Sequence, residues 1–463
     1  MQLTITAQNV NGLDNYSRDK FAKLLDTFNK HAFKNAEKKK YYEGKISLAE
    51  VNLGIALPDG MRNLEIGCAW GAKTVDVLAA RSMFDGFVGI NGNEVEDLTR
   101  MVIENKLVAQ YMKACRDELE FGSTFCTLSA GDNGVKIRFH SPMTAAALWD
   151  GEKNRIDCGF AIIDSIPADD NALTWQPSLI NLYTDDCVWV MRRDANTLWY
   201  ATPYRHKMGR PLMEPLTWNA TSDKPFGRSR IKEPIRRLIQ GYVRTIANAT
   251  IGLEFATSPQ KYLLGVTDDQ YDVVINQKFK QYVGAIIAAT TNPETGEKPT
   301  FGQLMQGNIS PHVSMIRLLA TQFSAATGLT VTDTGVVNDA NPTSSDAILA
   351  QSQTLVGMAE QLNTGNGDAL RTIALMALAI EQNKTLDDLT DEEKAIAPHF
   401  KNPAMPSVAV TADAAIKIAS ARQGFASTDT FLEMIGFDAA DIRRIKAQEQ
   451  RSRGLAVLEE MGI

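Results

Sequence analysis

The feature that most constrains this chain is a long polar loop held between two strongly signalled helices, within Phe301–Gln353. The first helix is predicted to begin at Ser310-Pro311, because a serine side chain caps free backbone amides and a proline in the first turn gives up no hydrogen bond. Its apolar residues recur at helical spacing as far as Gly328, a typical C-terminal stop. These residues are Val313, Ile316, Leu319, Ala320 and Phe323.

The second helix is predicted to begin within Pro342–Asp346, where a Ser or Thr cap precedes an acid that favours the helix dipole. It continues to Glu381, with an interruption at Gly365 and Gly367. The segment between the two helices, Thr330–Asn341, holds almost nothing that anchors a core. Long polar loops bracketed by helices are often functional, and an ordinary surface connection is the other interpretation of the same pattern.

Composition limits the class of protein. With 463 residues, of which 44% are apolar, the chain holds about three domain-sized units and ample material for a core. The net charge of −7 argues against a protein that coats nucleic acid through its overall field, and it leaves room for a local basic stripe. No apolar run is long enough to span a bilayer and no secretion signal is recognisable, so we expect a soluble intracellular product.

The five cysteines predict neither disulfides nor a zinc site. Their number is odd, none forms a C-x-x-C pair, and the five histidines are scattered. We therefore expect reduced thiols that are buried as small apolar groups, in a chain made in a reducing compartment. The cysteines are Cys68, Cys115, Cys126, Cys158 and Cys187.

The first part of the chain changes from helical to strand periodicity. Amphipathic helices are predicted at Asp19–Lys40, Lys73–Arg81 and Val95–Gly122. From Ser123 to His206, short runs rich in β-branched and aromatic residues alternate with polar turns, which predicts an antiparallel β unit. The proline-rich segment Pro203–Pro225 is predicted to be irregular. The first helix carries Phe21, Leu24, Leu25, Phe28 and His31 on one side, and its lysines form either a solvated face or a phosphate contact.

A cluster of basic residues marks Arg228–Ala256, which is predicted to be one long helix. Three of these residues, Arg228, Lys232 and Arg236, lie four positions apart and would form a row along one flank. Such a row is a solvated or salt-bridged surface, or else a track for phosphates, and the sequence leaves both open. The candidate site residues of this cluster are Arg228, Arg230, Lys232, Arg236 and Arg237, and Arg244 is a further basic residue of the same helix.

The remaining segments give shorter signals. The string KYLLGV beyond Pro259 predicts a strand, and SVAVTA at residues 407–412 predicts another. Helical patterns in the tail cover Asp413–Ala421 and Asp438–Leu458.

The sharpest enzyme-like string is LEIGCAWG at Leu64–Gly71, which imitates the glycine turn with which methyltransferases approach S-adenosylmethionine. Ala69 stands where that motif has glycine, Trp70 is bulky for such a turn, and the next hundred residues do not alternate strand with helix as a nucleotide-binding fold requires. A phosphate loop at Gly67–Thr74 has the wrong register. The chain shows no catalytic, cofactor-binding or metal-ligating constellation and is not predicted to be an enzyme.

Six strings follow one another along the chain: YYEGKISL at Tyr41, KTVDVLAARSMFDGF at Lys73, PFGRSRI at Pro225, PQKYLLG at Pro259, SPHVSMIRLLATQFSAATGL at Ser310 and NPTSSDAI at Asn341. In order and spacing, over about residues 40–385, they resemble the portal proteins of tailed bacteriophages. The resemblance is to the siphophage branch found in Gram-positive and actinobacterial hosts. The chain departs from that pattern at EIGCAWG and at Thr364–Asp368.

The resemblance implies an α+β, mostly α portal fold with a helical wing, an antiparallel β unit, paired stem helices, a small α/β clip, a long tunnel helix and a helical C-terminal crown. The segments would be the wing at 1–225, the first stem helix at 226–257, the clip at 258–308, the second stem helix at 309–327, the tunnel loop at 328–343, the long helix at 344–384, and the wing return and crown at 385–463.

The resemblance also implies a function and partners. Portal proteins form a ring, usually a dodecamer, at one capsid vertex of the virion, after synthesis in the host cytoplasm. Double-stranded DNA passes through the ring, which meets the large subunit of terminase, a head–tail adaptor, and the major capsid and scaffolding proteins. No cofactor and no membrane are implied.

On this resemblance the tunnel loop lines the channel with Thr330, Thr332, Asp333, Asn338, Asp339 and Asn341. The loop contains no Lys or Arg, so a duplex could slide past it without being gripped. The basic cluster would face either DNA or the neighbouring subunit. Two other functions remain as alternatives, an S-adenosylmethionine-dependent methyltransferase built on Leu64–Gly71 and a helical scaffolding or adaptor protein without a pore.

Overall fold

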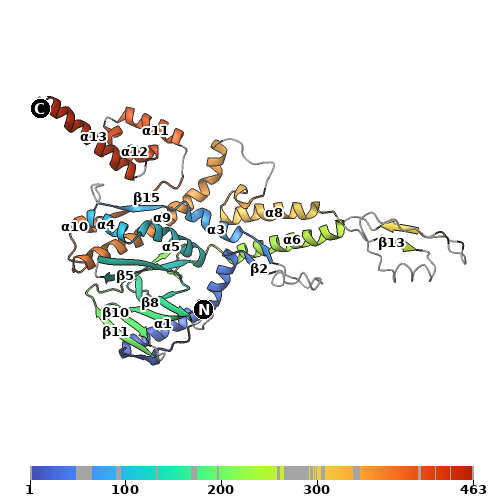
Figure 1. Cartoon of the computed structure of the whole chain (residues 1–463), viewed down its shortest axis with the longest axis horizontal. Coiled ribbons are helices and arrows are strands. Elements are labelled where there is room, and N and C mark those ends of the chain that lie inside the picture. Colours follow the sequence, from blue (N-terminus) through green and yellow to red (C-terminus); the bar gives the residue numbers. More distant parts are fainter. Residues whose placement is uncertain are drawn as a thin grey trace. The chain divides into compact units, whose positions relative to one another are not determined.

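The computed structural model divides into two compact units, Met1–Lys401 and Asn402–Ile463 (Figure 1). It describes residues 3–47, 65–89, 95–131, 134–167, 175–194, 198–257, 261–264, 291, 296, 298, 300–303, 308–336, 345–404, 408–422, 424–437 and 439–460. About half of these residues are helical, and two sizeable sheets accompany the helices. The fold class is therefore α+β, with helix and sheet more evenly balanced than the mostly α class that we expected.

A six-stranded sheet in the first unit has the order β1-β11-β10-β9-β8-β7. Five of its strands follow one another as antiparallel neighbours, and the two-residue β1 pairs in parallel with β11 at one edge. The antiparallel β unit predicted from the sequence is thereby confirmed. The strands are β1 (Val10–Asn11), β7 (Ala145–Asp150), β8 (Arg155–Pro167), β9 (Trp175–Tyr183), β10 (Cys187–Arg193) and β11 (Trp199–Arg205).

Helix α1 (Asn15–Tyr42) packs on this sheet through its apolar side. Asp14 caps the helix by accepting a hydrogen bond from the Ser17 amide at 2.8 Å. The rings of Phe21 and Phe28 lie 5.8 and 5.5 Å from the ring of Phe160 on β8. The predicted apolar face is confirmed for its four hydrophobic residues, which are buried.

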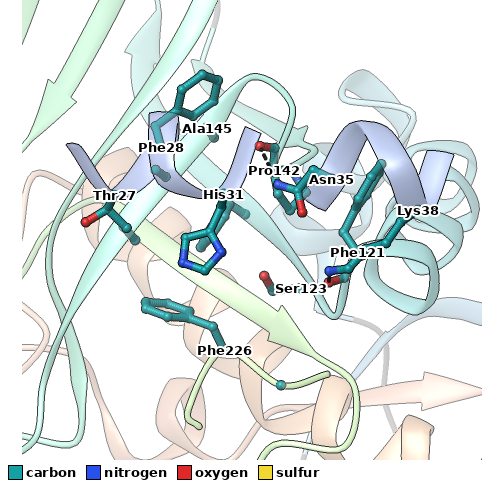
Figure 2. Close-up of a pocket in the computed structure, with 14 residues that line it drawn as sticks. Thr27, Phe28, His31, Asn35, Lys38, Phe121, Ser123, Pro142, Ala145 and Phe226 are labelled. Atoms are coloured by element: carbon teal, nitrogen blue, oxygen red, sulfur yellow. Dashed lines mark hydrogen bonds between the residues drawn. The ribbon is translucent and has the colours of Figure 1, made fainter. Parts of the chain in front are cut away.

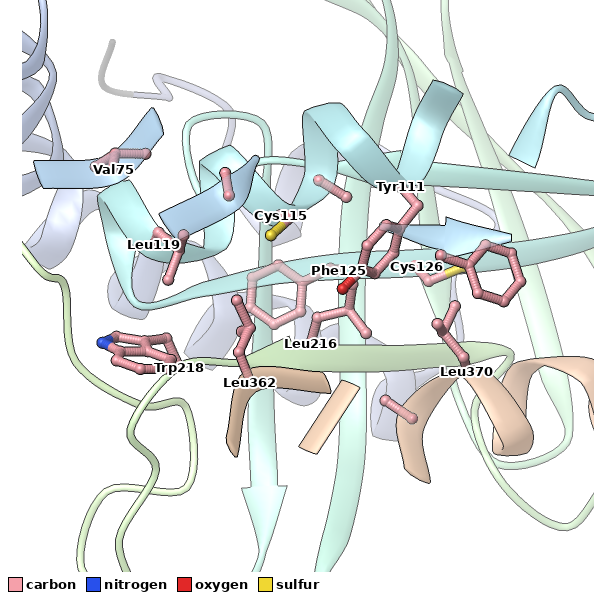
Figure 3. Close-up of a cluster of buried hydrophobic side chains, with 14 of the residues drawn as sticks. Val75, Tyr111, Cys115, Leu119, Phe125, Cys126, Leu216, Trp218, Leu362 and Leu370 are labelled. Carbon is pink, nitrogen blue, oxygen red and sulfur yellow. The ribbon is translucent and has the colours of Figure 1, made fainter. Parts of the chain in front are cut away.

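A second sheet, β12-β5-β6, lies at the centre of the largest core. It consists of β5 (Ser123–Gly131), β6 (Gly134–His140) and β12 (Met213–Thr217). Figure 3 shows buried side chains converging on it from helix α5 (Leu107–Phe121) and from helix α9 (Ser345–Glu381). The first six residues of β5 are all buried, as expected for a strand covered on both faces.

The first unit contains further helices and short ladders. They are the 3-10 turn η1 (Ala7–Asn9), helices α3 (Trp70–Ala79), α4 (Glu96–Glu104), α6 (Glu233–Thr257), α8 (Ser310–Thr327) and α10 (Asp391–Lys394), the 3-10 turn η3 (Thr332–Thr334), and three two-stranded ladders. The ladders are β2 (Lys45–Ser47) with β3 (Glu65–Gly67), β4 (Phe84–Val88) with β15 (Ala397–Phe400), and β13 (Lys261–Leu264) with β14 (Thr300–Gln303). The strand predicted from KYLLGV is confirmed as β13.

The second unit is helical. It contains α11 (Val408–Ala421), the 3-10 turn η4 (Phe425–Ser427), α12 (Asp429–Ile435) and α13 (Ala439–Glu460). The string SVAVTA, predicted to be a strand, instead opens α11, so this prediction was wrong. Its β-branched residues continue directly into an alanine-rich helical run with Ala415 buried, and tertiary packing overrides local strand preference.

Two further predictions in the first unit were wrong. The helix predicted over Val95–Gly122 is broken at Lys106, whose φ is 51°. The break is tertiary in origin, because the Asn105 side chain accepts from the Ile137 amide and donates to the Val135 carbonyl of β6, both at 2.9 Å. The segment predicted to be irregular contains β12 despite Pro215, which the sheet tolerates because β12 is an edge strand.

The predicted interruption of the long helix was also wrong, because α9 runs unbroken through Gly365 and Gly367. Asn366 between the two glycines is fully buried and hydrogen-bonded to α5, so tertiary contacts stabilise the helix where its intrinsic propensity is low.

All five cysteines are free and buried, as predicted. Across the part of the chain that the structure describes, no helix combines the length and the apolar character needed to cross a membrane.

Burial predicts a clear contrast in stability between two positions on α5. Leu119 is fully buried, so Leu119→Ala should lower the free energy of unfolding by about 2–5 kcal/mol through lost burial and a cavity. Val108→Ala on the exposed side of the same helix should change it by less than about 1 kcal/mol. Urea denaturation followed by fluorescence measures both, and equal midpoints for the two variants would contradict this account of the core.

Candidate functional site

The candidate site is built on the helix pair α6 and α8, which lie side by side in Figure 1. The predicted start of the first helix at Arg228 was wrong, because α6 begins at Glu233. Pro234 is the second helical residue, where its missing N–H costs nothing. Arg228, Arg230 and Lys232 therefore precede the helix, and the expected i, i+4 row along one helical flank does not exist.

Helix α8 agrees with its prediction to within one residue. Its cap position is Ile309 rather than Ser310, and the Ser310 amide donates to Asn308 Oδ1 at 2.9 Å. Gly328 ends the helix with a φ of 72°, as predicted. Of the predicted apolar face, Leu319, Ala320 and Phe323 are buried, whereas Val313 is exposed.

Arg230 is the polar centre of the site. It is only 7% exposed, and its guanidinium reaches three separate elements. Nε donates to the Thr74 carbonyl of α3 at 2.7 Å, and Nη2 donates to the Thr327 carbonyl at the end of α8 at 2.8 Å. Nη1 lies 3.4 Å from the sulfur of Met358 on α9.

The electrostatics of Arg230 follow from this burial. Desolvation lowers the pKa of its guanidinium to about 10, which leaves the group charged at neutral pH. The charge lies at the C-terminal end of α8, where the helix dipole favours a cation and the last carbonyls lack helical partners. The ring of Trp218, 5.6 Å away, adds a cation–π contact.

Trp70 is the aromatic centre of the site. Its ring lies 4.5 Å from that of Tyr242 on α6 and 4.7 Å from that of Phe323 on α8. Its indole N–H donates to the Thr334 carbonyl at 3.2 Å. Trp70 thus joins both helices of the pair to the loop that follows α8.

The base of that loop is ordered by local contacts. The Thr330 amide and hydroxyl each donate to Asp333 Oδ2 at 2.9 Å, which closes a turn at η3. Leu329 is buried, and Ser324 Oγ donates to its carbonyl at 2.6 Å. Gly328 has a φ of 72°, which favours glycine, and a Cβ there would lie 2.6 Å from Met358 Cε of α9.

The predicted loop residues are only partly placed. Thr330, Thr332 and Asp333 lie in this ordered base. Asn338, Asp339 and Asn341 lie outside the described residues, as does the predicted start of the second helix before Ser345.

The structure does not bring the basic cluster together. Arg236 pairs with Glu37 of α1 and with Glu233, and its guanidinium lies 5.8 Å from the ring of Tyr41. Arg237, whose side chain is 73% exposed, also bonds to Glu233, at 2.8 Å. Of the other residues, Arg228 is exposed and lies 3.6 Å from Asp223, Lys232 is exposed, and Arg230 is buried as described.

The methyltransferase interpretation of Leu64–Gly71 was wrong. Among the described residues β3 pairs only with β2, in an antiparallel ladder, so the turn after it does not belong to a parallel nucleotide-binding sheet. The turn is also filled, because Trp70 is 3% exposed and packs between aromatic rings.

A separate cavity of about 200 Å³ lies between α1, β5, β7 and the segment at Phe226 (Figure 2). Its walls combine apolar and polar side chains, and His31 and Ser123 face the space in Figure 2. Lys38 Nζ donates to the Phe121 carbonyl at 2.7 Å, and burial, together with Arg236, lowers its pKa to about 8. The sequence did not predict this cavity, because its lining comes from segments about 200 residues apart.

Sequence reasoning also missed the architectural role of Arg230 and Trp70. Arg230 precedes the apolar Ile231, but Arg237 precedes Leu238 in the same way, and Trp70 stands out only as too bulky for a glycine turn. Neither pattern signals a buried centre.

The geometry of Arg230 predicts that lysine cannot replace it. Arg230→Lys should lower the free energy of unfolding by about 1–3 kcal/mol, because one ammonium cannot reach both carbonyls from the positions of Nε and Nη2. Arg237→Lys, at an exposed position on α6, should change it by less than about 0.5 kcal/mol. Urea midpoints decide the matter, and a lysine variant as stable as the parent would contradict the anchoring role.

Comparison with known proteins agrees with the earlier resemblance. The model of the family "Phage portal protein, SPP1 Gp6-like" matches residues 22–454. The chain is 22% identical over 460 residues to the portal protein of Mycobacterium phage D29, covering 96% of this chain and 91% of that protein.

Solved structures similar to this chain include the virion of a native gene transfer agent particle, with 13% identity, a TM-score of 0.44, and coverage of 80% of this chain and 89% of that one. The neck of the same kind of particle, computed with C12 symmetry, gives 12% identity and a TM-score of 0.43 with the same coverage. The family model extends over nearly the whole sequence, and this chain belongs to the phage portal protein family.

Proposed function

We propose that this protein forms a closed ring at one vertex of a phage capsid and that double-stranded DNA passes through the ring during packaging and ejection. The observation that carries the proposal is the family match over residues 22–454, which spans both compact units. The role is structural rather than enzymatic, since a conduit has to let DNA pass without reacting with it.

The parts of the chain would then serve as a wing at 1–225, stem helices at 226–257 and 309–327, a clip at 258–308, a tunnel loop at 328–343, a long helix at 344–384, and a wing return and crown at 385–463. The side-by-side packing of α6 and α8 supports the stem assignment. The contacts of Trp70 and Arg230 at the end of α8 support a loop held from a firm base.

Apolar residues on the stem support a ring. Val313, Leu318 and Leu253 are each more than two-fifths exposed in the single chain, although they lie on well-packed helices. Exposed apolar positions gathered on one pair of helices are typical of a surface that another protein covers. In a head-to-tail ring, the neighbouring copy would cover it.

The charges support a channel that does not trap DNA. Each phosphate contact adds to affinity, and a strongly basic channel would have to break many of them at every step. Arg230 and Arg236 already have partners inside the chain, and the described loop residues 328–336 contain no Lys or Arg. Arg228, Lys232 and Arg237 are the exposed members of the basic cluster, and they would face DNA or the neighbouring subunit.

The same role defines the partners. We expect the large subunit of terminase and a head–tail adaptor to dock on the ring during packaging and tail joining. We expect the major capsid protein and a scaffolding protein to surround it at the vertex.

Native mass spectrometry with negative-stain imaging tests the ring. Twelve chains of 50.9 kDa give a particle of about 611 kDa with a central hole. A compact dimer without a hole would contradict the proposal and favour the scaffolding or adaptor alternative. If the free protein is a monomer, the same measurement on portal vertices isolated from capsids must give the ring.

The loop assignment predicts a packaging defect without an assembly defect. Deletion of Thr332–Asn338 should leave the ring intact and lower the yield of DNA-filled particles at least about tenfold, because the channel loses its narrow lining. Asp333→Ala, which breaks the turn with Thr330, should cause a smaller loss.

Asp388→Ala is the matched control. Asp388 Oδ2 accepts from the amide and hydroxyl of Thr385, at 3.1 and 2.6 Å, in a turn of the same kind away from the loop. Particle yield is measured by gradient centrifugation and DNA content. An unchanged yield for the deletion, or equal losses for the two aspartate variants, would show that the loop does not line the channel.

A further inference from the structure

The middle of the long helix α9 carries a buried polar contact to α5. Asn366, between two glycines, is fully buried. Its amide nitrogen donates to Glu118 Oε2 at 2.8 Å and to the hydroxyl oxygen of Tyr111 at 2.9 Å. The Tyr111 hydroxyl in turn lies 2.7 Å from the hydroxyl of Ser82.

Two oxygens of this contact lack partners. Glu118 Oε1 and Asn366 Oδ1 are both buried, and neither has a hydrogen-bond partner among the described residues. When Glu118 is ionised, both oxygens can accept hydrogen bonds but cannot donate them, so the two side chains alone cannot satisfy them. Each bare buried acceptor destabilises the fold, and a bare buried charge destabilises it more.

The surroundings of Glu118 offer nothing to balance a charge. Its side chain is fully buried, and no salt bridge reaches it in the described parts of the chain. The titratable groups that face it are Tyr111 and Cys115 on its own helix, both neutral at physiological pH. From α9 it meets Asn366, and from the segment after α3 it meets Ser82 through Tyr111.

We propose that Glu118 is held as a neutral carboxylic acid and that, with Asn366, it forms a positioning pair that pins α9 to α5. The proton turns a bare acceptor oxygen into a donor, for which the unpartnered Asn366 Oδ1 is available. The pair lies where Gly365 and Gly367 would otherwise weaken the helix, so it stabilises α9 at its least helix-prone point.

The contact between Glu118 and Asn366 also affects the loop after α8. Gly328, at the base of that loop, lies against Thr354 and Met358 of α9. Asn366 follows Met358 by eight residues, or about 12 Å along the helix. Holding α9 at Asn366 therefore holds the surface on which the loop base rests. The consequence for a DNA channel depends on the proposed function, whereas the protonation of Glu118 does not.

The pair makes stability depend on pH in a defined direction. Burial raises the pKa of Glu118 from 4.5 to about 8, against a smaller opposing effect of the Asn366 hydrogen bond. The folded state therefore keeps this proton when the unfolded chain has lost it. The stabilisation is fully present below pH 4.5, declines as the pH rises, and is gone once the pH passes about 8.

Glu118→Gln tests the pair, because glutamine has the shape of the neutral acid and cannot ionise. Between pH 5 and pH 8.5 the Tm of the variant should rise relative to the parent by about 5 °C. Comparing the two proteins at each pH removes the contribution of the other titrating groups to Tm, because that contribution is common to both. The matched control is Glu120→Gln, which removes a second buried acid of α5 whose pKa burial also raises to about 8. Its Tm should change with pH in the same direction, so the two variants are separated by their effect on α9, to which Glu118 is bonded through Asn366.

Two measurements separate this role from simple packing. The infrared difference spectrum of parent minus Glu118→Gln at pH 6.5 should contain the C=O stretch of a buried carboxylic acid. In the parent and in Glu120→Gln, hydrogen exchange of the α9 amides should accelerate above pH 8 by more than the intrinsic effect of pH. In Glu118→Gln this additional acceleration should be absent.

Three results would overturn the proposal. The first is an infrared spectrum that shows an ionised carboxylate at pH 6.5. The second is the same pH profile of Tm for the parent and Glu118→Gln. The third is failure of Glu118→Gln to fold at pH 6.5, because a site built for a neutral acid accepts its neutral isostere. None of these results depends on ring formation, so failure of the Glu118–Asn366 proposal can be distinguished from failure of the proposed portal function.

Discussion

The buried guanidinium of Arg230 is the interaction on which the arrangement of the stem and loop depends. A cation this deeply buried is tolerated only because two backbone carbonyls, from α3 and from the end of α8, accept its hydrogen bonds. Those bonds fix the chain just before α6 to the last residue of α8 and to α3. The stacking of Trp70 on both helices completes the joint, so the loop after α8 starts from a rigid base.

The buried ionisable groups of this chain serve its architecture. Arg230 is hydrogen-bonded and Arg236 is ion-paired within the chain, and Glu118 lies against Asn366 in a buried contact between helices. The described loop residues near the end of α8 carry one acid and no base. This division suits a protein whose partner is a polyanion in motion, because fixed charges that hold the fold are kept out of reach of the phosphates.

Sequence reasoning succeeded where a signal was local. Helical periodicity predicted α1, α8 and most of α9, and Gly328 was correctly predicted as a helix end. It failed where a distant segment decides the local structure. Lys106 breaks a helix because Asn105 binds β6, and Pro215 lies in a strand because the edge of β5 is open to it. The candidate site divides in the same way, since the loop was predicted while its anchors at Arg230 and Trp70 were not.

The sequence by itself determined the family, the periodic helices and strands, the polar loop after Gly328 and the absence of paired cysteines. Each of these depends on residues that are neighbours in the sequence or on the order of short sequence strings. Only the tertiary structure decided which charges are exposed and which are buried, because burial depends on elements that meet across more than 100 residues of chain. Arg230 and Arg237 read alike in the sequence, yet one bonds carbonyls in the core and the other lies in water, and that difference separates a structural anchor from a surface that partners can reach.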